Sequence, residues 1–360
     1  MEKNVIIAGA GLAGLTAAIT LARQGVSVRV LEAREKIGHG YSLADSSYLD
    51  PEAVESYLGV DIRPALSPWP YTRIYAYGLR REVAHPRGAK AYTIERGQGE
   101  NSLENVLYRQ ALASGVTVEL KSRLAPSELR DLPPGSIIAT GLSTEAFQTL
   151  QLPHKPFYCH LAMGAPEPSR PPVIVYFDSF CREFGYYFQS QNAAGALCFN
   201  VDRPLSASEL SAFKEKLLQN DGIRFDSWSD HLAQVASWPL GAGDTRRLFW
   251  QDKILCGTIA GAISPVLVFG VHGALSSGKI AAVAVHDKEK AERLFKQMSP
   301  WHYYYPQLGL RKMRERWPHA ILRPLLQGMV ATYHPDLFPY MMRFAMQPPG
   351  MSFSGRMRRL

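Results

Sequence analysis

A chain of 360 residues is too long for one typical hydrophobic core, so we expect two or three domains. With 46% hydrophobic and 20% charged residues, its composition excludes a disordered or fibrous chain. The four cysteines form no CxxC pair and no metal-ligand spacing, which favours reduced, buried thiols over disulfides or a metal site. No basic region followed by an apolar one opens the chain, so no signal peptide is predicted and we expect a cytoplasmic protein.

The formal net charge of +8 is concentrated at one end of the chain. Residues 301–360 hold nine Lys and Arg and two acidic residues, whereas the first 300 residues are almost neutral. Such a segment suits nucleic acid, an anionic membrane or an acidic partner. No nucleic-acid-binding module accompanies it, so we expect no nucleic-acid partner.

The first predicted elements are a strand over 4–8, a glycine-rich turn over 9–14, a helix that ends at Gly25 and a strand over 26–31. The opening apolar run is too short for a helix and rich in β-branched residues, which favours a buried parallel strand. The second strand ends on an acid, Glu32. Strand, glycine turn, helix, strand and acid follow one another in the order that a dinucleotide-binding site needs.

Three glycines and the acid have separate roles in such a site. Gly9 permits the tight turn, Gly11 lets a pyrophosphate approach the backbone, and Gly14 lets the helix pack close to the strand. The helix N-terminus offers N–H groups and partial positive charge to the phosphates. Glu32 would accept hydrogen bonds from a ribose. The alternative, a glycine turn without a ligand, explains the placement of the acid less well.

Strands and helices alternate through the rest of the first half. The pattern predicts helices over 51–58 and 102–114, short antiparallel strands across 71–94, and further strands of the parallel sheet over 116–120 and 136–141. Six prolines over 153–172 favour irregular structure there. Strands over 173–177, 185–189 and 196–199 then predict a second, antiparallel sheet, and Ser206 with Glu209 forms a capping box ahead of a helix.

Residues 254–275 carry no formal charge and are long enough to cross a membrane. Pro265 and four glycines interrupt this run, and its ends lack the flanks of a membrane helix. We therefore predict a strand, an irregular loop and a helix that starts near Gly270.

Together these motifs resemble the FAD-dependent oxidoreductases of the para-hydroxybenzoate hydroxylase superfamily, and within it the geranylgeranyl reductases and their relatives. The resemblance covers roughly residues 3–295 and rests on segments 9–14 with Glu32, 94–96, 138–141, 256–265 and 270–282. It implies an α/β fold: an FAD-binding Rossmann-like parallel sheet, an inserted antiparallel-sheet substrate domain and a C-terminal helical segment. The expected domains are an FAD-binding domain of residues 1–70, 97–155 and 245–300, a substrate domain of 71–96 and 156–244, and a helical region of 301–360.

The resemblance also implies which residues contact FAD. Ala13 would lie at the pyrophosphate, Arg96 at the entry of the second long helix, and Leu124 at the adenine through its backbone. Thr258 would lie along the ribityl chain, and the N–H groups of Gly270 and Val271 would reach the flavin pyrimidine oxygen. The full expected set is Gly9, Gly11, Ala13, Gly14, Glu32, Ala33, Arg34, Ala44, Arg96, Leu124, Gly141, Thr258, Gly270 and Val271.

Three residues are candidates for chemistry or substrate contact. His272 stands in the first turn of the helix expected to face the flavin, where it could donate a proton; the alternative is a structural histidine on an apolar helix. Tyr186 and Phe188 alternate along a strand of the second sheet and could enter a substrate pocket; the alternative is ordinary sheet core.

The resemblance implies an FAD-dependent oxidoreductase for a hydrophobic substrate, with isoprenoids as a candidate class and an unknown electron donor. Thr140-Gly141 replaces the Asp-Gly of the hydroxylases, which favours a reductase over a flavin monooxygenase. Thr258 and Leu43 also differ from the family pattern and keep open a non-catalytic protein that binds flavin or lipid. Aromatic residues and cations after residue 300 suit peripheral contact with an anionic membrane; a helical cap on the FAD-binding domain is the alternative.

Overall fold

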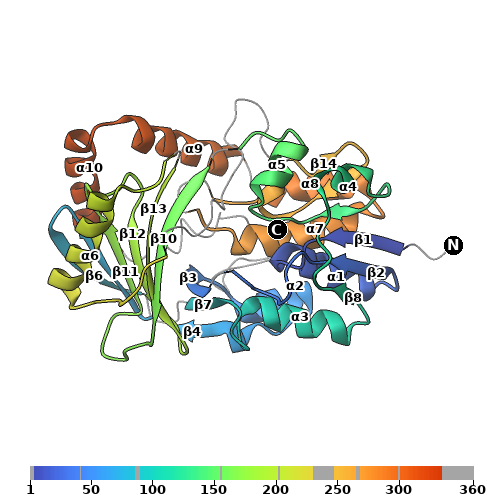
Figure 1. The fold of residues 1–360 in the computed structure, drawn as a ribbon, viewed down its shortest axis with the longest axis horizontal. Helices are drawn as coiled ribbons and strands as arrows, with labels where there is room; N and C mark the ends of the chain where they lie inside the picture. The colour runs from blue at the N-terminus through green and yellow to red at the C-terminus, as the bar shows by residue number, and fades with distance from the viewer. Residues whose placement is uncertain are drawn as a thin grey trace.

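The computed structural model describes residues 4–40, 42–85, 90–154, 156–201, 203–229, 247–264, 268–298 and 301–334. Within these ranges, the strands form two six-stranded sheets and one three-stranded sheet. The two larger sheets lie at opposite ends of the molecule along its long axis, and the small sheet lies between them (Figure 1).

The first sheet contains the N-terminal strand. Its strand order is β14 (Phe249–Trp250), β15 (Lys253–Leu255), β9 (Ile137–Ile138), β1 (Asn4–Ala8), β2 (Ser27–Leu31) and β8 (Thr117–Glu119). All neighbours are parallel except β14 and β15. The loops that follow β15, β9, β1 and β2 therefore leave the sheet at the same edge, where open α/β sheets bind their ligands.

Helices α1 (Leu12–Ala22), α3 (Leu103–Ala113), α7 (Val271–Ala284) and α8 (Lys288–Met298) belong to this half, with α1 in contact with both α3 and α7. Two short helices, α4 (Pro126–Asp131) and α5 (Thr144–Thr149), pack on each other nearby. Ile7, Val30 and Leu255 are fully buried, as expected of parallel strands covered on both faces.

The second six-stranded sheet has the order β10 (Phe157–Gly164), β13 (Ala194–Val201), β12 (Gly185–Gln189), β11 (Val173–Phe177), β5 (Tyr71–Ala76) and β6 (Leu79–Ala84). Only the β11–β5 pair is parallel. One face packs on α6 (Ala207–Asp221), which begins with the predicted Ser206–Glu209 capping box. Alternate residues such as Tyr186 and Phe188 belong to the core shared with the first sheet.

The small sheet joins the two halves. It consists of β3 (Ser42–Tyr48), β7 (Ala91–Gly97) and β4 (Leu66–Pro68), and β3 also contacts β12 and β13. Beside it lie α2 (Pro51–Leu58), which Asp50 caps, and a 3₁₀ turn over Arg63–Ala65. The fold class predicted from the sequence, including its C-terminal helices, is confirmed.

Two local predictions were wrong. Strand β10 forms inside the proline-rich segment, because Pro153 and Pro156 precede it and Pro166 follows it, so no proline removes a hydrogen-bond donor from its ladder. The strands across 71–94 do not form one sheet: β5 and β6 make a hairpin, whereas β7 pairs with β3 and β4.

The uncharged run of residues 254–275 holds β15, a 3₁₀ turn and part of α7, as expected. Within the described ranges, no helix is long and apolar enough to cross a bilayer.

The last described elements are α9 (Trp301–Arg316) and α10 (His319–Thr332), which lie on the second sheet at the end of the molecule away from β1 and β2 (Figure 1). A buried ion pair anchors α9: Arg311 Nη1 and Nη2 donate to the two carboxylate oxygens of Glu183 at 2.7 and 2.6 Å, and both side chains are 1% exposed. Arg314 lies 3.2 Å from the same carboxylate. Residues 335–360, with Arg343, Arg356, Arg358 and Arg359, lie outside the described residues.

We predict that Glu183→Gln lowers the free energy of unfolding by about 3 kcal/mol, because it removes the more deeply buried of the two carboxylates that pair with Arg311. Urea unfolding measures this. The control is Glu55→Gln, which removes an ion pair to Arg63 whose two side chains are nearly half exposed, and should cost less than about 1 kcal/mol. Equal losses in the two variants would show that the Arg311–Glu183 pair does not anchor α9.

Candidate functional site

The turn after β1 can be built only with glycine at two positions. Gly9 has φ +108°, and a Cβ there would lie 2.5 Å from the carbonyl oxygen of Ala139. A Cβ on Gly14 would lie 2.0 Å from the carbonyl oxygen of Gly9. These contacts hold α1 against the turn and the turn against the end of β9. Gly11 differs, because a Cβ there would meet no atom within 4 Å. Open space therefore borders the backbone at the start of α1.

Glu32 is tied to this turn. Its carboxylate accepts hydrogen bonds from the backbone N–H of Ala10 at 2.8 Å and of Arg34 at 2.9 Å. A carboxylate has about four acceptor positions, so two hydroxyl donors can still be bound. Ala33 and Arg34, which follow Glu32, are exposed. The Arg34 side chain lies against Gly40, where an added Cβ would be 2.7 Å from Arg34 Nη1. The predicted ribose acceptor thus lies beside the predicted phosphate turn.

A second loop reaches the same place from β15. It forms a 3₁₀ turn over Gly257–Ala260. Gly257 has φ +75°, and a Cβ there would lie 3.0 Å from the Cβ of Ala13. Its N–H donates to Ser277 Oγ at 2.8 Å. Half-buried Thr258 follows, and its Oγ1 lies 3.8 Å from where a Cβ on Gly270 would be. The structure therefore brings Ala13, Thr258 and Gly270 together, although the last two lie some 250 residues from the first.

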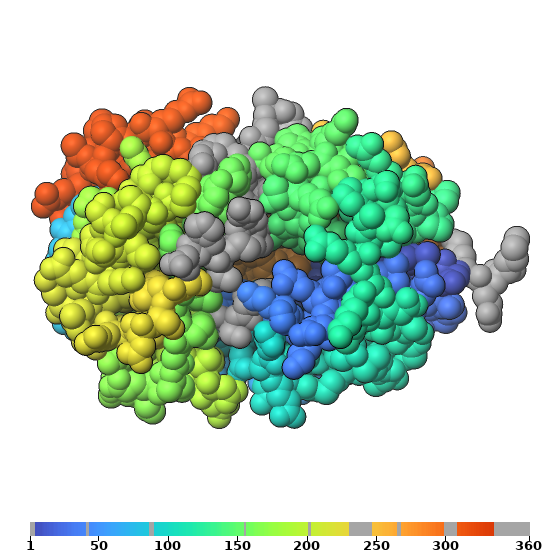
Figure 2. All heavy atoms as spheres, viewed as in Figure 1, coloured from blue at the N-terminus to red at the C-terminus, as the bar shows by residue number. Residues whose placement is uncertain are grey.

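Helix α7 begins at this junction. Among the described residues, no side chain caps it at Gly270 and no acid occupies its first turn. Its N-terminus, at Val271, therefore presents partial positive charge to the space beside Thr258. A Cβ on Gly278 would lie 2.4 Å from the carbonyl oxygen of Ala13, so α7 packs tightly on α1. Figure 2 shows a hollow between the two halves, with the orange segment that includes α7 visible at its base.

Arg96 occupies a more constrained position than expected. Its Nε donates to Glu104 Oε1 at 2.7 Å and its Nη1 donates to Asp45 Oδ2 at 2.6 Å. Burial raises the pKa of Asp45, while the adjacent Arg96 guanidinium acts in the opposite direction. This network links β3, β7 and α3, and contact of Arg96 with FAD stays a prediction.

Two other residues of the predicted FAD-binding set are Leu124 and Gly141. Leu124 is half-buried after β8. Gly141 has φ +63°, and a Cβ there would meet no atom within 4 Å.

Tyr186 and Phe188 project from β12 toward the cofactor half. Their rings are stacked, with centroids 5.7 Å apart, and the Tyr186 hydroxyl donates to the carbonyl oxygen of Ala44 at 3.4 Å. Ala44 is fully buried on β3. Burial raises the pKa of Tyr186, so its phenol stays protonated at neutral pH. Predicted substrate and cofactor residues thus meet at this contact.

His272 is buried in the first turn of α7, with its ring centroid 4.8 Å from that of Phe269. Burial lowers the pKa of His272 to about 3. Its imidazole is therefore neutral at physiological pH and can take part in hydrogen bonds but does not act as a cationic acid. Its predicted catalytic role stays a prediction.

Several residues that shape the site were not among the sequence candidates. Ser277 orients Gly257, and Gly278 sets the approach of α7 to α1. The sequence feature that could have pointed to them is the group of small residues at 273, 274 and 276–278. Asp45 and Glu104 hold Arg96, but no local pattern marks two acids that lie 59 positions apart.

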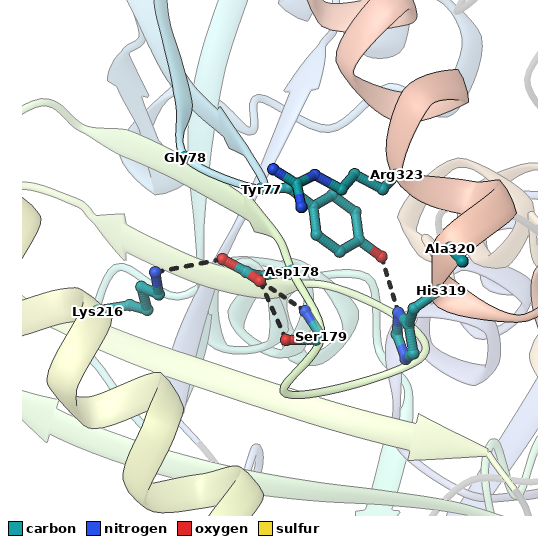
Figure 3. Close-up of a pocket in the computed structure, with 8 residues that line it drawn as sticks. All are labelled: Tyr77, Gly78, Asp178, Ser179, Lys216, His319, Ala320 and Arg323. Atoms are coloured by element: carbon teal, nitrogen blue, oxygen red, sulfur yellow. Dashed lines mark hydrogen bonds and ion pairs between the residues drawn. The ribbon is translucent and has the colours of Figure 1, made fainter.

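A separate pocket of about 360 Å³ lies on the second sheet beside α10. Tyr77 Oη is 2.7 Å from His319 Nδ1, and Lys216 pairs with Asp178 at 3.5 Å. Arg323 extends from α10 toward Tyr77 (Figure 3). The pocket residues lie on or beside the second six-stranded sheet, α6 and α10, at the end of the molecule away from β1 and α1 (Figure 1), so this pocket is distinct from the predicted FAD site.

Comparisons with known proteins agree with this geometry. A family model described as an NAD(P)-binding Rossmann-like domain matches residues 7–57. Lysine-specific histone demethylase 1 homolog 3 of Arabidopsis thaliana is 60% identical over 48 residues. That segment is 13% of this chain and 3% of the demethylase homolog, so the chain corresponds to a small part of that relative.

Solved structures extend the likeness to most of the chain. A geranylgeranyl bacteriochlorophyll reductase-like protein of Thermoplasma acidophilum is 16% identical with TM-score 0.60, covering 93% of this chain and 90% of that one. The p-nitrophenol 4-monooxygenase PnpA of Pseudomonas putida is 13% identical with TM-score 0.62, covering 94% and 97%. CtdE, solved in complex with FAD and a substrate, is 15% identical with TM-score 0.57, covering 87% and 88%. The chain has the fold of FAD-dependent oxidoreductases and monooxygenases, and the resemblance predicted from the sequence is confirmed at the level of the fold.

We predict that Gly11→Ala weakens FAD binding at least about tenfold while thermal stability is unchanged, because the added methyl group meets no protein atom and would enter the space where we expect the pyrophosphate. Gly309→Ala on α9, whose added methyl group would also meet no atom, is the matched control and should leave FAD affinity unchanged. Fluorescence titration of the apoprotein with FAD measures both. Normal affinity in the Gly11 variant would place the cofactor elsewhere.

We also predict a specific loss of stability in acid. The folded-state pKa of His272 lies below its unfolded value, so between about pH 6.5 and 3 the unfolded chain binds more protons. The contribution of neutral His272 to the free energy of unfolding is therefore fully present above pH 6.5. It is lost as the pH is lowered toward 3, by at most about 1.4 kcal/mol per pH unit. In His272→Gln, this part of the pH dependence of the free energy of unfolding should be absent. His286→Gln, which changes an exposed histidine, serves as control. Denaturant unfolding between pH 7 and 4 tests it; identical slopes in all three proteins contradict it.

Proposed function

We propose that this protein is an FAD-dependent oxidoreductase that acts on a hydrophobic substrate, with isoprenoids as the first class to test. One observation carries the proposal: the glycine turn after β1, the 3₁₀ turn after β15 and the N-terminus of α7 converge at the carboxyl edge of the parallel sheet. FAD, when bound there, would supply the redox chemistry. The fold of the solved relatives supports the same cofactor and an enzymatic role.

The chain's own residues would bind and orient this cofactor. The N–H groups at the start of α1, beside Gly11, would hold the pyrophosphate, and Glu32 would accept ribose hydroxyls. Thr258 would donate or accept a hydrogen bond along the ribityl chain. The N-terminus of α7, at Gly270 and Val271, would favour negative charge on the flavin ring.

The substrate would lie between β12 and the cofactor. Tyr186 and Phe188 are buried at this boundary, and their rings would form an apolar wall that suits a hydrocarbon better than a charged molecule. Protonated Tyr186 holds a proton at its hydroxyl oxygen, next to Ala44 of β3. We therefore propose Tyr186 as a hydrogen-bond donor that orients the substrate by exchanging its bond to the Ala44 carbonyl oxygen for one to the substrate. The parallel sheet with its helices would serve as the FAD-binding unit and the second six-stranded sheet as the substrate unit.

A monooxygenase is the second candidate, because PnpA shares the fold over nearly the whole chain. Thr140-Gly141 in place of Asp-Gly favours the reductase. The two differ in dioxygen use: under anaerobic conditions, a reductase's reduced flavin is reoxidised by a polyprenyl alcohol, whereas a monooxygenase consumes dioxygen in step with product. Flavin that is reduced readily but reoxidised by neither would indicate the third candidate, a non-catalytic flavin- or lipid-binding protein.

We predict that Tyr186→Phe slows substrate-dependent reoxidation of the reduced flavin about tenfold or more, because the ring remains but the donor is lost. Tyr187→Phe is the matched control: Tyr187 is the neighbouring residue on the opposite face of β12, in the core against α6. Its rate should stay within about twofold of wild type. Anaerobic stopped-flow absorbance with a polyprenyl alcohol gives both rates. Equal slowing by the two changes would assign Tyr186 a structural role only.

A further inference from the structure

The outward face of α10 is apolar. Ile321, Leu325 and Met329 recur every four residues and are 50%, 49% and 49% exposed, so they form one continuous stripe on the helix surface. Leu310, inside α9, and Trp317, just after its end, add exposed apolar surface. We call the three residues of α10 the α10 stripe. In Figure 2, α9 and α10 form the red surface at one end of the molecule.

The opposite face of α10 is fixed to the protein. Leu322 and Val330 are buried, and Gln327 Nε2 donates to the carbonyl oxygen of Tyr77 at 3.1 Å. Arg81 Nη1 donates to the carbonyl oxygen of Val330 at 2.9 Å. With its inner face bound in this way, α10 cannot turn its stripe inward. The stripe therefore faces away from the second sheet.

The exposed charges of α9 and α10 are mainly positive. Helix α10 contains no acidic residue, and Lys312, Arg316 and Arg323 are exposed. Glu315, the one acid of α9, is turned toward the buried Arg311 at 3.2 Å. The 26 residues after position 334 add four arginines and one aspartate by composition.

The pocket at the start of α10 has the same sign. It holds Lys216, Arg323 and Asp178, and Lys216 pairs with Asp178. Burial lowers the pKa of His319, which keeps this lining residue neutral at physiological pH. The lining therefore carries one net positive charge, next to the hydroxyl of Ser179 (Figure 3).

We propose that α9 and α10 dock on an anionic phospholipid bilayer, with the α10 stripe among the upper acyl chains and the exposed Lys and Arg of the two helices at the level of the headgroup phosphates. An exposed apolar stripe on a pair of helices whose exposed charged residues are Lys and Arg is the kind of surface that anionic membranes bind. This surface extends the proposed function, because a hydrophobic substrate would be delivered from the bilayer. Lipid binding itself requires neither FAD nor turnover.

Vesicle sedimentation tests the proposal on the full chain, with phosphatidylcholine vesicles that contain or lack phosphatidylglycerol. Wild type should sediment with the anionic vesicles at low salt. Replacement of Ile321, Leu325 and Met329 by Gln should weaken this binding at least about tenfold. The matched control replaces Leu112 and Leu218, which are 46% and 53% exposed on other helices, by Gln and should bind as wild type. Replacement of Lys312, Arg316 and Arg323 by Gln should abolish the preference for phosphatidylglycerol.

Thermal unfolding checks that each variant is folded. Wild-type binding by the stripe variant would overturn the proposal, as would wild type that sediments with neither vesicle. A wild-type dimer in analytical ultracentrifugation that the stripe variant loses would show that a second copy covers the stripe, which also overturns it. Binding that disappears on truncation after His334 but survives in the stripe variant would assign it to the terminal segment instead. Protein that binds anionic vesicles but no FAD supports this proposal and refutes only the proposed function.

Discussion

The close approach of two helices to one glycine turn is the constraint on which the site depends. Helix α1 lies against the turn because Gly14 has no side chain to strike the carbonyl oxygen of Gly9. Helix α7 reaches α1 because Gly278 leaves room for the carbonyl oxygen of Ala13, and the loop from β15 reaches Ala13 through Gly257. Each contact is made by backbone where a side chain would not fit. A methyl group at Gly14 or Gly278 would separate the turn, α1 and α7, which converge at the proposed FAD site.

The second half of the molecule is held at a defined position relative to this turn. Strand β3 pairs with β7 in the small sheet and contacts β12 of the large one. The ion pairs of Arg96 with Asp45 and Glu104 fix β3 against α3, and the hydroxyl of Tyr186 reaches the backbone of β3 at Ala44. The position of β12 relative to the glycine turn is thus set by a few polar contacts across a largely apolar boundary.

Local sequence predicted the parts of the site that depend on local geometry. The glycine turn, Glu32 and the start of α7 follow from spacing along short segments, and the structure places them together. Pairing partners of strands could not be read in this way. Strand β7 joined β3 and not β5, because strand pairing depends on contacts between distant segments. The prolines around β10 marked its ends, although their density suggested irregular structure.

Burial was the other quantity that the sequence left open. His272 stood at a position suited to catalysis, and only the packing of α7 shows that its ring is buried and neutral. The apolar residues of α10 would ordinarily be taken as its inner face. Contacts from Tyr77 and Arg81, more than 200 residues away, decide that Ile321, Leu325 and Met329 face outward.

The central claim is that the carboxyl edge of the parallel sheet binds one FAD. Absorbance of the wild-type protein after incubation with FAD and gel filtration tests it most directly. The flavin bands should elute with the protein at one FAD per chain. A colourless protein peak, with all flavin in the late fractions, would contradict it.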